Sequence, residues 1–127
     1  MRTDIDVMVL DDELTVCDRL KDFLAKNGMK VETFVDSGAA VERLAQKRFH
    51  VVVTDLKMKG PTGLDVLVAA KRQNLPPQVI VITAYRTFED TRAAECVGAY
   101  AFLDKPFHLE ELRDLVKKAA KRAQKQA

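Results

Sequence analysis

The strongest constraint on the fold is a regular alternation of short apolar runs with segments of helical periodicity. Five runs rich in β-branched residues predict strands at residues 5–10, 30–35, 49–54, 79–82 and 100–103. The segments that follow them predict helices over 14 to about 27, from a cap at Asp36 or Ser37 through Ala45, 63 to about 74, about 87 to 97, and from about 109 onward. With right-handed crossovers, this pattern predicts a doubly wound α/β fold: a five-stranded parallel sheet in the flavodoxin-like order 2-1-3-4-5, with helices on both faces.

Some side chains of these segments have expected positions. The helix after the third strand should turn Leu64, Leu67 and Val68 inward and stop before Pro76-Pro77, because proline interrupts helices. The last helix should bury a stripe of Leu112, Val116, Ala119 and Ala123. Cys17 and Cys96 lie in apolar-patterned segments without partner spacing, so we expect two buried free thiols.

Length and charge limit the organisation of the chain. Its 127 residues suit a single domain over residues 1–127, and no apolar run approaches the roughly 20 residues of a membrane span. The acidic start of the chain does not resemble a signal peptide, so we expect a cytoplasmic protein without membrane attachment.

The end of the chain is basic. Residues 117–127 hold five of the 21 basic residues and no acid, which leaves 16 basic against 19 acidic residues, a net charge of −3, for the rest. We expect this segment to be the solvated end of the last helix and the start of a linker, and we expect no direct nucleic-acid binding.

Acidic residues follow two strands that the predicted order places side by side. The first strand runs into Asp11-Asp12-Glu13, and the third ends at Asp55. Ligands of such sheets bind at the carboxyl ends of the strands, where the strand order reverses. Clustered carboxylates repel one another, and a hard cation such as Mg²⁺ (or Mn²⁺) relieves that repulsion. One carboxylate could then act as a nucleophile toward a phosphoryl group.

The remaining strands supply groups that suit a phosphoryl ligand. The fourth ends at Thr83, whose hydroxyl can donate a hydrogen bond, followed by the small Ala84. The fifth leads into Lys105, whose ammonium could pair with Asp55, and Pro106 is a candidate for a cis peptide bond. The joint placement of acids, threonine and lysine at one edge argues for a site.

Four segments together resemble the receiver domain of two-component response regulators: VMVLDDE at 7–13, VVVTDLKM at 51–58, VITAY at 81–85 and AYAFLDKPF at 99–107. The similarity covers essentially the whole chain and is strongest to receivers of the NtrC-like class. It implies phosphoryl transfer to Asp55 from a sensor histidine kinase or a histidine phosphotransfer protein. The implied metal ligands are Asp11, Asp12, Asp55 and the backbone carbonyl of Lys57; the implied phosphoryl-binding residues are Thr83, Ala84 and Lys105; the implied switch residues are Thr83 and Phe102.

The resemblance also implies an output surface and no enzymatic turnover beyond self-phosphorylation and self-dephosphorylation. That surface comprises the fourth helix, the fifth strand and the fifth helix, and would bind a partner or a second copy of the chain. Arg86, Arg92, Tyr100 and Arg113 are candidate members of it. The chain departs from the family at Lys59, where proline is usual, with Pro61 two positions later, and at Thr62, which replaces an acid.

Three alternatives remain open from sequence. A pseudo-receiver would keep the fold and act through protein contacts without phosphorylation. A phosphatase with an aspartyl nucleophile would usually carry that acid on the first strand and a second acid two positions later, where this chain has Lys57. A flavin-binding protein would need donors in its first loop, and Asp11-Asp12-Glu13 would instead repel the flavin phosphate.

Overall fold

The computed structural model describes residues 4–56, 63–84 and 87–125, which form five strands and five helices in strict alternation. In chain order these elements are β1 (Asp6–Leu10), α1 (Leu14–Lys26), β2 (Lys30–Phe34), α2 (Ser37–Gln46), β3 (Val51–Asp55), α3 (Gly63–Lys71), β4 (Gln78–Thr83), α4 (Phe88–Val97), β5 (Ala101–Asp104) and α5 (Leu109–Gln124).

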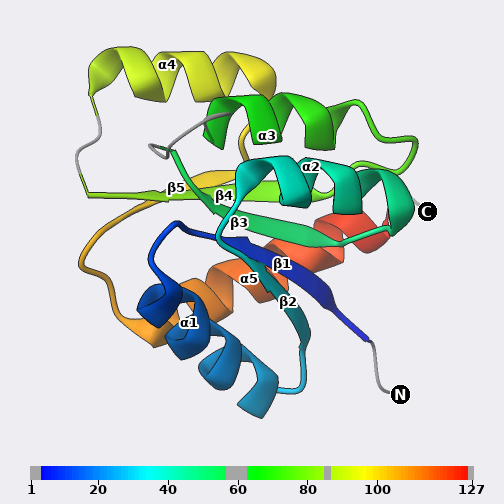
Figure 1. Ribbon diagram of the computed structural model, residues 1–127, viewed down its shortest axis with the longest axis vertical. Helices are drawn as coiled ribbons and strands as arrows, with labels where there is room; N and C mark the ends of the chain where they lie inside the picture. Colours follow the sequence, from blue (N-terminus) through cyan, green and yellow to red (C-terminus); the bar gives the residue numbers. More distant parts are fainter. Residues whose placement is uncertain (1–3, 57–62, 85–86, 126–127) are drawn as a thin grey trace.

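The strands form one parallel sheet in the order β2-β1-β3-β4-β5, so the predicted topology is confirmed. Helices α1 and α5 cover one face, and α2, α3 and α4 cover the other (Figure 1). The strand order reverses between β1 and β3, whose register pairs Leu10 with Thr54. The residues that follow Leu10 therefore lie beside the end of β3.

Each strand contributes alternate side chains to two separate cores, as the two-residue period of a strand requires. Val9, Val53 and Ile80 face α1 and α5 and pack with Leu20 and Leu112. Their neighbours in sequence face the other helices: Met8, Val52 and Val81 pack with residues of α2, α3 and α4. The continuous apolar runs in the sequence arise because both faces of the sheet are covered.

Two details of the sequence-based expectations were wrong. Helix α3 ends at Lys71 rather than near Asn74, and it buries Val66 and Ala70 beside Leu67. Leu64 packs against the core as expected, whereas Val68 is only partly buried. The error arose because apolar residues occupy almost every position of α3, so its period does not identify one face. Cys96 is exposed on α4, while Cys17 is buried as expected.

The helix ends follow local signals. The Asp36 side chain accepts a hydrogen bond from the Gly38 amide and caps α2, and Thr87 forms a reciprocal capping box with Asp90 at the start of α4. Gly98 ends α4 at a φ of 107°, a left-handed conformation that favours glycine. The stripe of α5 is buried as predicted, together with Ala120.

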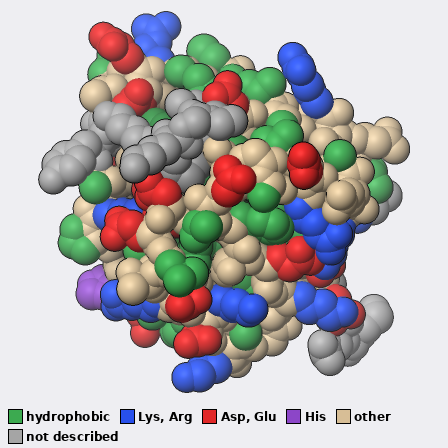
Figure 2. Space-filling view, viewed as in Figure 1, with side chains coloured by type: hydrophobic (Ala, Val, Ile, Leu, Met, Phe, Trp, Pro, Cys, Tyr) green, Lys and Arg blue, Asp and Glu red, His purple; other side chains and the backbone are tan. Residues whose placement is uncertain are grey.

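The surface is mixed in charge. Figure 2 shows Lys and Arg side chains interspersed with Asp and Glu side chains over the face seen in Figure 1. Among the helices in the described ranges, none combines the length and the apolar character that crossing a membrane would require.

Candidate functional site

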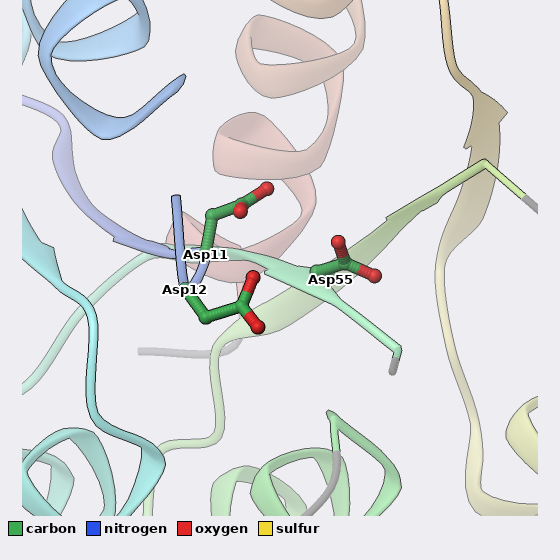
Figure 3. Close-up of side chains that lie close together, drawn as sticks. All are labelled: Asp11, Asp12 and Asp55. Carbon is green, nitrogen blue, oxygen red and sulfur yellow. The ribbon is translucent and has the colours of Figure 1, made fainter. Parts of the chain in front are cut away.

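Three carboxylates meet at the carboxyl edge of the sheet. Asp11 and Asp12 follow β1, and Asp55 is the last residue of β3 (Figure 3). Each offers an oxygen, and these three atoms lie within 4.8 Å of one another. Asp11 and Asp55 are buried and Asp12 is exposed, so the cluster opens to solvent on one side.

Hydrogen bonds hold both the side chain and the backbone of Asp11. The amide of Glu13 donates to Asp11 Oδ1 at 2.9 Å, and the backbone amide of Asp11 donates to the Phe34 carbonyl at 3.1 Å. Below it, the Cys17 thiol lies 3.3 Å from the Asp11 carbonyl oxygen and donates to it. Burial is the main reason that the pKa of Cys17 is raised, which keeps the thiol protonated as a donor.

The backbone at Asp55 is held against the start of α3. The Thr54 hydroxyl donates to the Asp55 carbonyl at 2.9 Å, and the Gly63 amide donates to the Leu56 carbonyl at 3.0 Å. A Cβ atom at Gly63 would overlap the Asp55 carbonyl oxygen and would approach the Leu56 Cα to 2.7 Å. Only glycine allows this approach, so Gly63 sets the position of the β3 end.

Lys105 joins the two buried acids. Its Nζ donates to Asp11 Oδ2 at 2.7 Å and to Asp55 Oδ2 at 2.9 Å. Burial acts to lower the pKa of Lys105, but the hydrogen bonds and charges of these two aspartates outweigh it and raise the pKa above its ordinary value. The ammonium is therefore charged and partly neutralises the cluster.

The other predicted residues lie at the neighbouring strand ends. Thr83 is buried and its carbonyl accepts a hydrogen bond from the Lys105 amide at 2.9 Å, while Ala84 is exposed. The Lys105–Pro106 peptide bond is cis, which was the candidate identified from sequence. Phe102 is partly buried on β5, in register with Val81, and packs against the core beneath α2, α3 and α4.

Several sequence-based expectations fall on residues outside the described ranges. These are Lys57, with its proposed carbonyl ligand, the departures at Lys59, Pro61 and Thr62, and Arg86 of the output surface.

A cavity adjoins the carboxylate cluster. Its volume is about 520 Å³, and it lies between α1 and the connection from β5 to α5. Val16 and Leu20 line it from α1, and Lys105, Pro106 and Phe107 line it from the connection. An apolar surface thus lies directly beside the ammonium that contacts Asp11 and Asp55.

The donor set fits a hard divalent cation. Three carboxylates from two adjacent strands provide oxygen ligands on an open side of the sheet, and Mg²⁺ and Mn²⁺ both accept such ligands while retaining water. Asp11, Asp12 and Asp55 would hold the ion.

Sequence reasoning placed Asp11, Asp55 and Lys105 at one edge of the sheet, where they lie in contact, but it missed two contacts. It paired Lys105 with Asp55 alone, whereas Asp11 is an equal partner. It treated Gly63 as a helix start and overlooked its close approach to Asp55. A glycine directly before a helical pattern and after an acidic strand end is the signal that could have identified this contact.

The family of the chain follows from a match of residues 7–117 to the model of the response regulator receiver domain. The chain belongs to this family. Receiver domains are signalling modules of two-component systems, and they bind Mg²⁺ through acidic residues such as those clustered here.

Relatives in sequence are regulators of the same kind. The chain is 32% identical over 120 residues to the DNA-binding transcriptional regulator NtrC of Escherichia coli, covering 94% of this chain and 26% of NtrC. It is 30% identical over 124 residues to the transcriptional regulatory protein FixJ of Bradyrhizobium diazoefficiens, covering 98% of this chain and 60% of FixJ. The chain thus spans less than two thirds of either relative.

Solved structures agree in fold. A receiver domain protein from Clostridium thermocellum superposes with a TM-score of 0.89 at 26% identity, covering 97% of this chain and 99% of that one. The N-terminal part of FixJ superposes with a TM-score of 0.85 at 28% identity, covering 94% and 96% of the two chains.

Proposed function

We propose that the chain is a phosphorylation-dependent switch in which Asp55 accepts a phosphoryl group from the phosphohistidine of a sensor histidine kinase or of a histidine phosphotransfer protein. The observation that supports this most strongly is the arrangement at the carboxyl edge: three carboxylates within 4.8 Å, with the Lys105 ammonium bonded to two of them. Asp55 is the member that ends a central strand beside the open side of the cluster.

The chemistry is a direct transfer. An Asp55 oxygen attacks phosphorus, the P–N bond to the donor imidazole breaks, and an acyl phosphate forms on Asp55. Mg²⁺, when bound, would reduce the repulsion between the carboxylates and the incoming phosphoryl oxygens. Lys105 exchanges part of its bonding from Asp55 to the phosphoryl group, and the Thr83 hydroxyl and the open space at Ala84 accommodate the remaining oxygens.

Transfer would change the surface formed by α4, β5 and α5. Movement of Thr83 toward the phosphoryl group opens space on the β4–β5 side, and Phe102 turns inward to fill it. The altered surface controls a partner or the formation of a homodimer, with Arg92, Tyr100 and Arg113 among its members. Such a change requires only that the phosphoryl group stabilises one of two packed states of this surface more than the other.

We place the receiver domain at residues 1–127 and the start of a linker within 117–127, acting in the cytoplasm. This assignment rests on the family match to residues 7–117 and on the basic composition of the last eleven residues. In a longer regulator, the linker would transmit the switch to the next domain.

Intact mass after incubation with acetyl phosphate tests the proposal. We expect a gain of one phosphoryl group that requires both Mg²⁺ and Asp55, and no gain in Asp55→Asn. Asp65→Asn is a matched control because Asp65 is an acid near the start of α3 that lies outside the cluster. Failure of the wild-type chain to gain mass, with Mg²⁺ or Mn²⁺ present, would favour the pseudo-receiver.

A further inference from the structure

Three cationic side chains from separate segments of the chain lie at the amino edge of the sheet, opposite the carboxylate cluster. Arg48 lies between α2 and β3, Lys71 ends α3, and Arg122 lies near the end of α5. Arg48 Nη2 donates to the carbonyl of Ala123, the neighbour of Arg122, at 3.0 Å. The pKa of Lys71 is lowered by burial and further by the charge of Arg122. We call the surface formed by Arg48, Lys71 and Arg122 the basic edge.

Within the described ranges, none of these three cations forms an ion pair with an acid. Two acids on neighbouring strands, Asp6 and Glu32, are instead bound by Lys47 at 3.3 and 3.0 Å. Arg48 Nε is also buried and has no hydrogen-bond partner there. Cations without an acidic partner in the described ranges, two of which (Lys71 and Arg122) repel one another, favour the binding of an anionic group.

A cavity of about 220 Å³ adjoins the basic edge. Arg48 is the member of the basic edge that lines it. The rest of its polar side is formed by Gln46, Lys47, Gln73 and Asn74, and Phe49, Leu75 and Pro77 belong to its apolar side. The end of α5, the end of α2 and the connection from α3 to β4 all reach this side of the molecule (Figure 1). A ligand that fits must therefore carry both negative charge and an apolar group.

We propose that the basic edge binds an acidic peptide segment, with its carboxylates on Arg48, Lys71 and Arg122 and one apolar side chain in the adjoining cavity. A free phosphate or a nucleic-acid backbone would satisfy the cations but leave the apolar side of the cavity without a partner. The surface lies at the opposite end of the strands from Asp55, so its residues take no direct part in phosphoryl transfer.

The peptide acetyl-Glu-Glu-Leu-Glu-Glu-amide tests the proposal, with the ¹⁵N-labelled chain observed by NMR. We expect amide shifts concentrated at residues 46–49, at 73–77 and at the end of α5. Two matched peptides separate the charge from the apolar group: glutamine in place of glutamate, and glycine in place of leucine. Each should bind at least about fivefold more weakly, and added salt should weaken the parent peptide.

Variants of the chain locate the site. Arg48→Gln and Lys71→Gln should each weaken binding at least about threefold, while Lys21→Gln, which removes an exposed charge from α1, should leave it unchanged. Lys71→Gln removes no hydrogen bond within the described ranges, so it tests the site even if Arg48→Gln loosens the end of α5. Absence of shifts, or equal binding by both variants and the control, would overturn the proposal. Equal shifts with a thymidine oligonucleotide or with inorganic phosphate would also overturn it.

Discussion

The two edges of the sheet use charge in opposite ways. At the carboxyl edge, Asp11 and Asp55 are buried against one another and are joined by Lys105, which contacts both at less than 3 Å. At the amino edge, Arg48 and Lys71 are partly buried without an acidic partner in the described ranges. A buried charge cluster with an internal counter-ion is preorganised for a reaction, whereas cations without acidic partners in the described ranges are suited to binding an anion.

The largest effect on the carboxyl edge should come from Gly63→Ala. The added Cβ would overlap the backbone of Asp55 and Leu56, so the end of β3 must shift. We expect a loss of about 1–3 kcal/mol in unfolding free energy, measured by urea denaturation, together with much slower phosphorylation from acetyl phosphate.

Gly38→Ala is the matched control, because a Cβ there meets only the Asp36 side chain, at 3.6 Å and beyond. That variant should be neutral or stabilised by about 0.5–1 kcal/mol. Equal stability of the two variants would contradict the role assigned to the Gly63 contact.

Lys105→Met should remove the counter-ion of the carboxyl edge while keeping an apolar side chain of similar length. It therefore tests whether the paired state of this edge matters. Loss of the ammonium leaves Asp11 and Asp55 more negative, so Mn²⁺ should bind about tenfold more tightly in a calorimetric titration. Phosphorylation should nevertheless be slower, because the phosphoryl oxygens lose a partner. Lys21→Met should change neither property, and weaker Mn²⁺ binding by Lys105→Met would refute the competition between ammonium and metal.

A substitution of Glu32 tests the ion network that this residue forms with Arg43 and Lys47. Its carboxylate accepts hydrogen bonds from Arg43 and Lys47, and the bond from Arg43 is the main cause that lowers the pKa of Glu32 to about 2. We expect Glu32→Gln to lose about 0.5–1 kcal/mol at pH 7, because the pair is partly solvated.

The pH dependence of this loss has a defined sign. A lowered pKa in the folded state stabilises the fold above the unfolded value of 4.5, and this contribution disappears as pH falls toward 2. The difference between Glu32→Gln and the wild type should therefore shrink in urea titrations from pH 5 to pH 3. A constant difference would contradict the ionic origin.

Protonation of His50 should have the smallest effect on stability. Its Nδ1 accepts a hydrogen bond from the Asp6 amide at 3.0 Å, which requires the neutral ring, and burial is the main cause that lowers its pKa. The unfolded chain takes up the proton first, so stability should fall as pH drops below the ordinary value of 6.5. NMR titration should give a pKa for His50 below the ordinary histidine value of 6.5. A His50 pKa at or above 6.5 would show that the neutral ring is not held as an acceptor.

The sequence predicted the fold well because its signals are local and repeated. Continuous valine and isoleucine runs indicated strands buried on both faces, and the strand order then placed Asp11, Asp12, Asp55, Thr83 and Lys105 at one edge. Helix α3 was misjudged because an apolar residue at nearly every position leaves no distinct period. The exposure of Cys96 was missed because a helical pattern alone does not show which residues face solvent at its margin.

Contacts between residues that are far apart in the sequence were harder to predict. The bond from Lys105 to Asp11 joins residues 94 positions apart and depends on side-chain reach rather than on strand order. That Lys47 binds both Asp6 and Glu32, and that neither Arg48 nor Lys71 has an acidic partner in the described ranges, could not be read from composition.

The most direct test of the switch compares amide NMR spectra of the chain before and after phosphorylation with acetyl phosphate and Mg²⁺, beside Asp55→Asn. We predict shifts at the carboxyl edge that extend through Thr83 and Phe102 into α4, β5 and the exposed face of α5, and none in Asp55→Asn. Phosphorylation of Asp55 with shifts confined to the carboxyl edge would show that the group is accepted without any change in the output surface, and would contradict the switch.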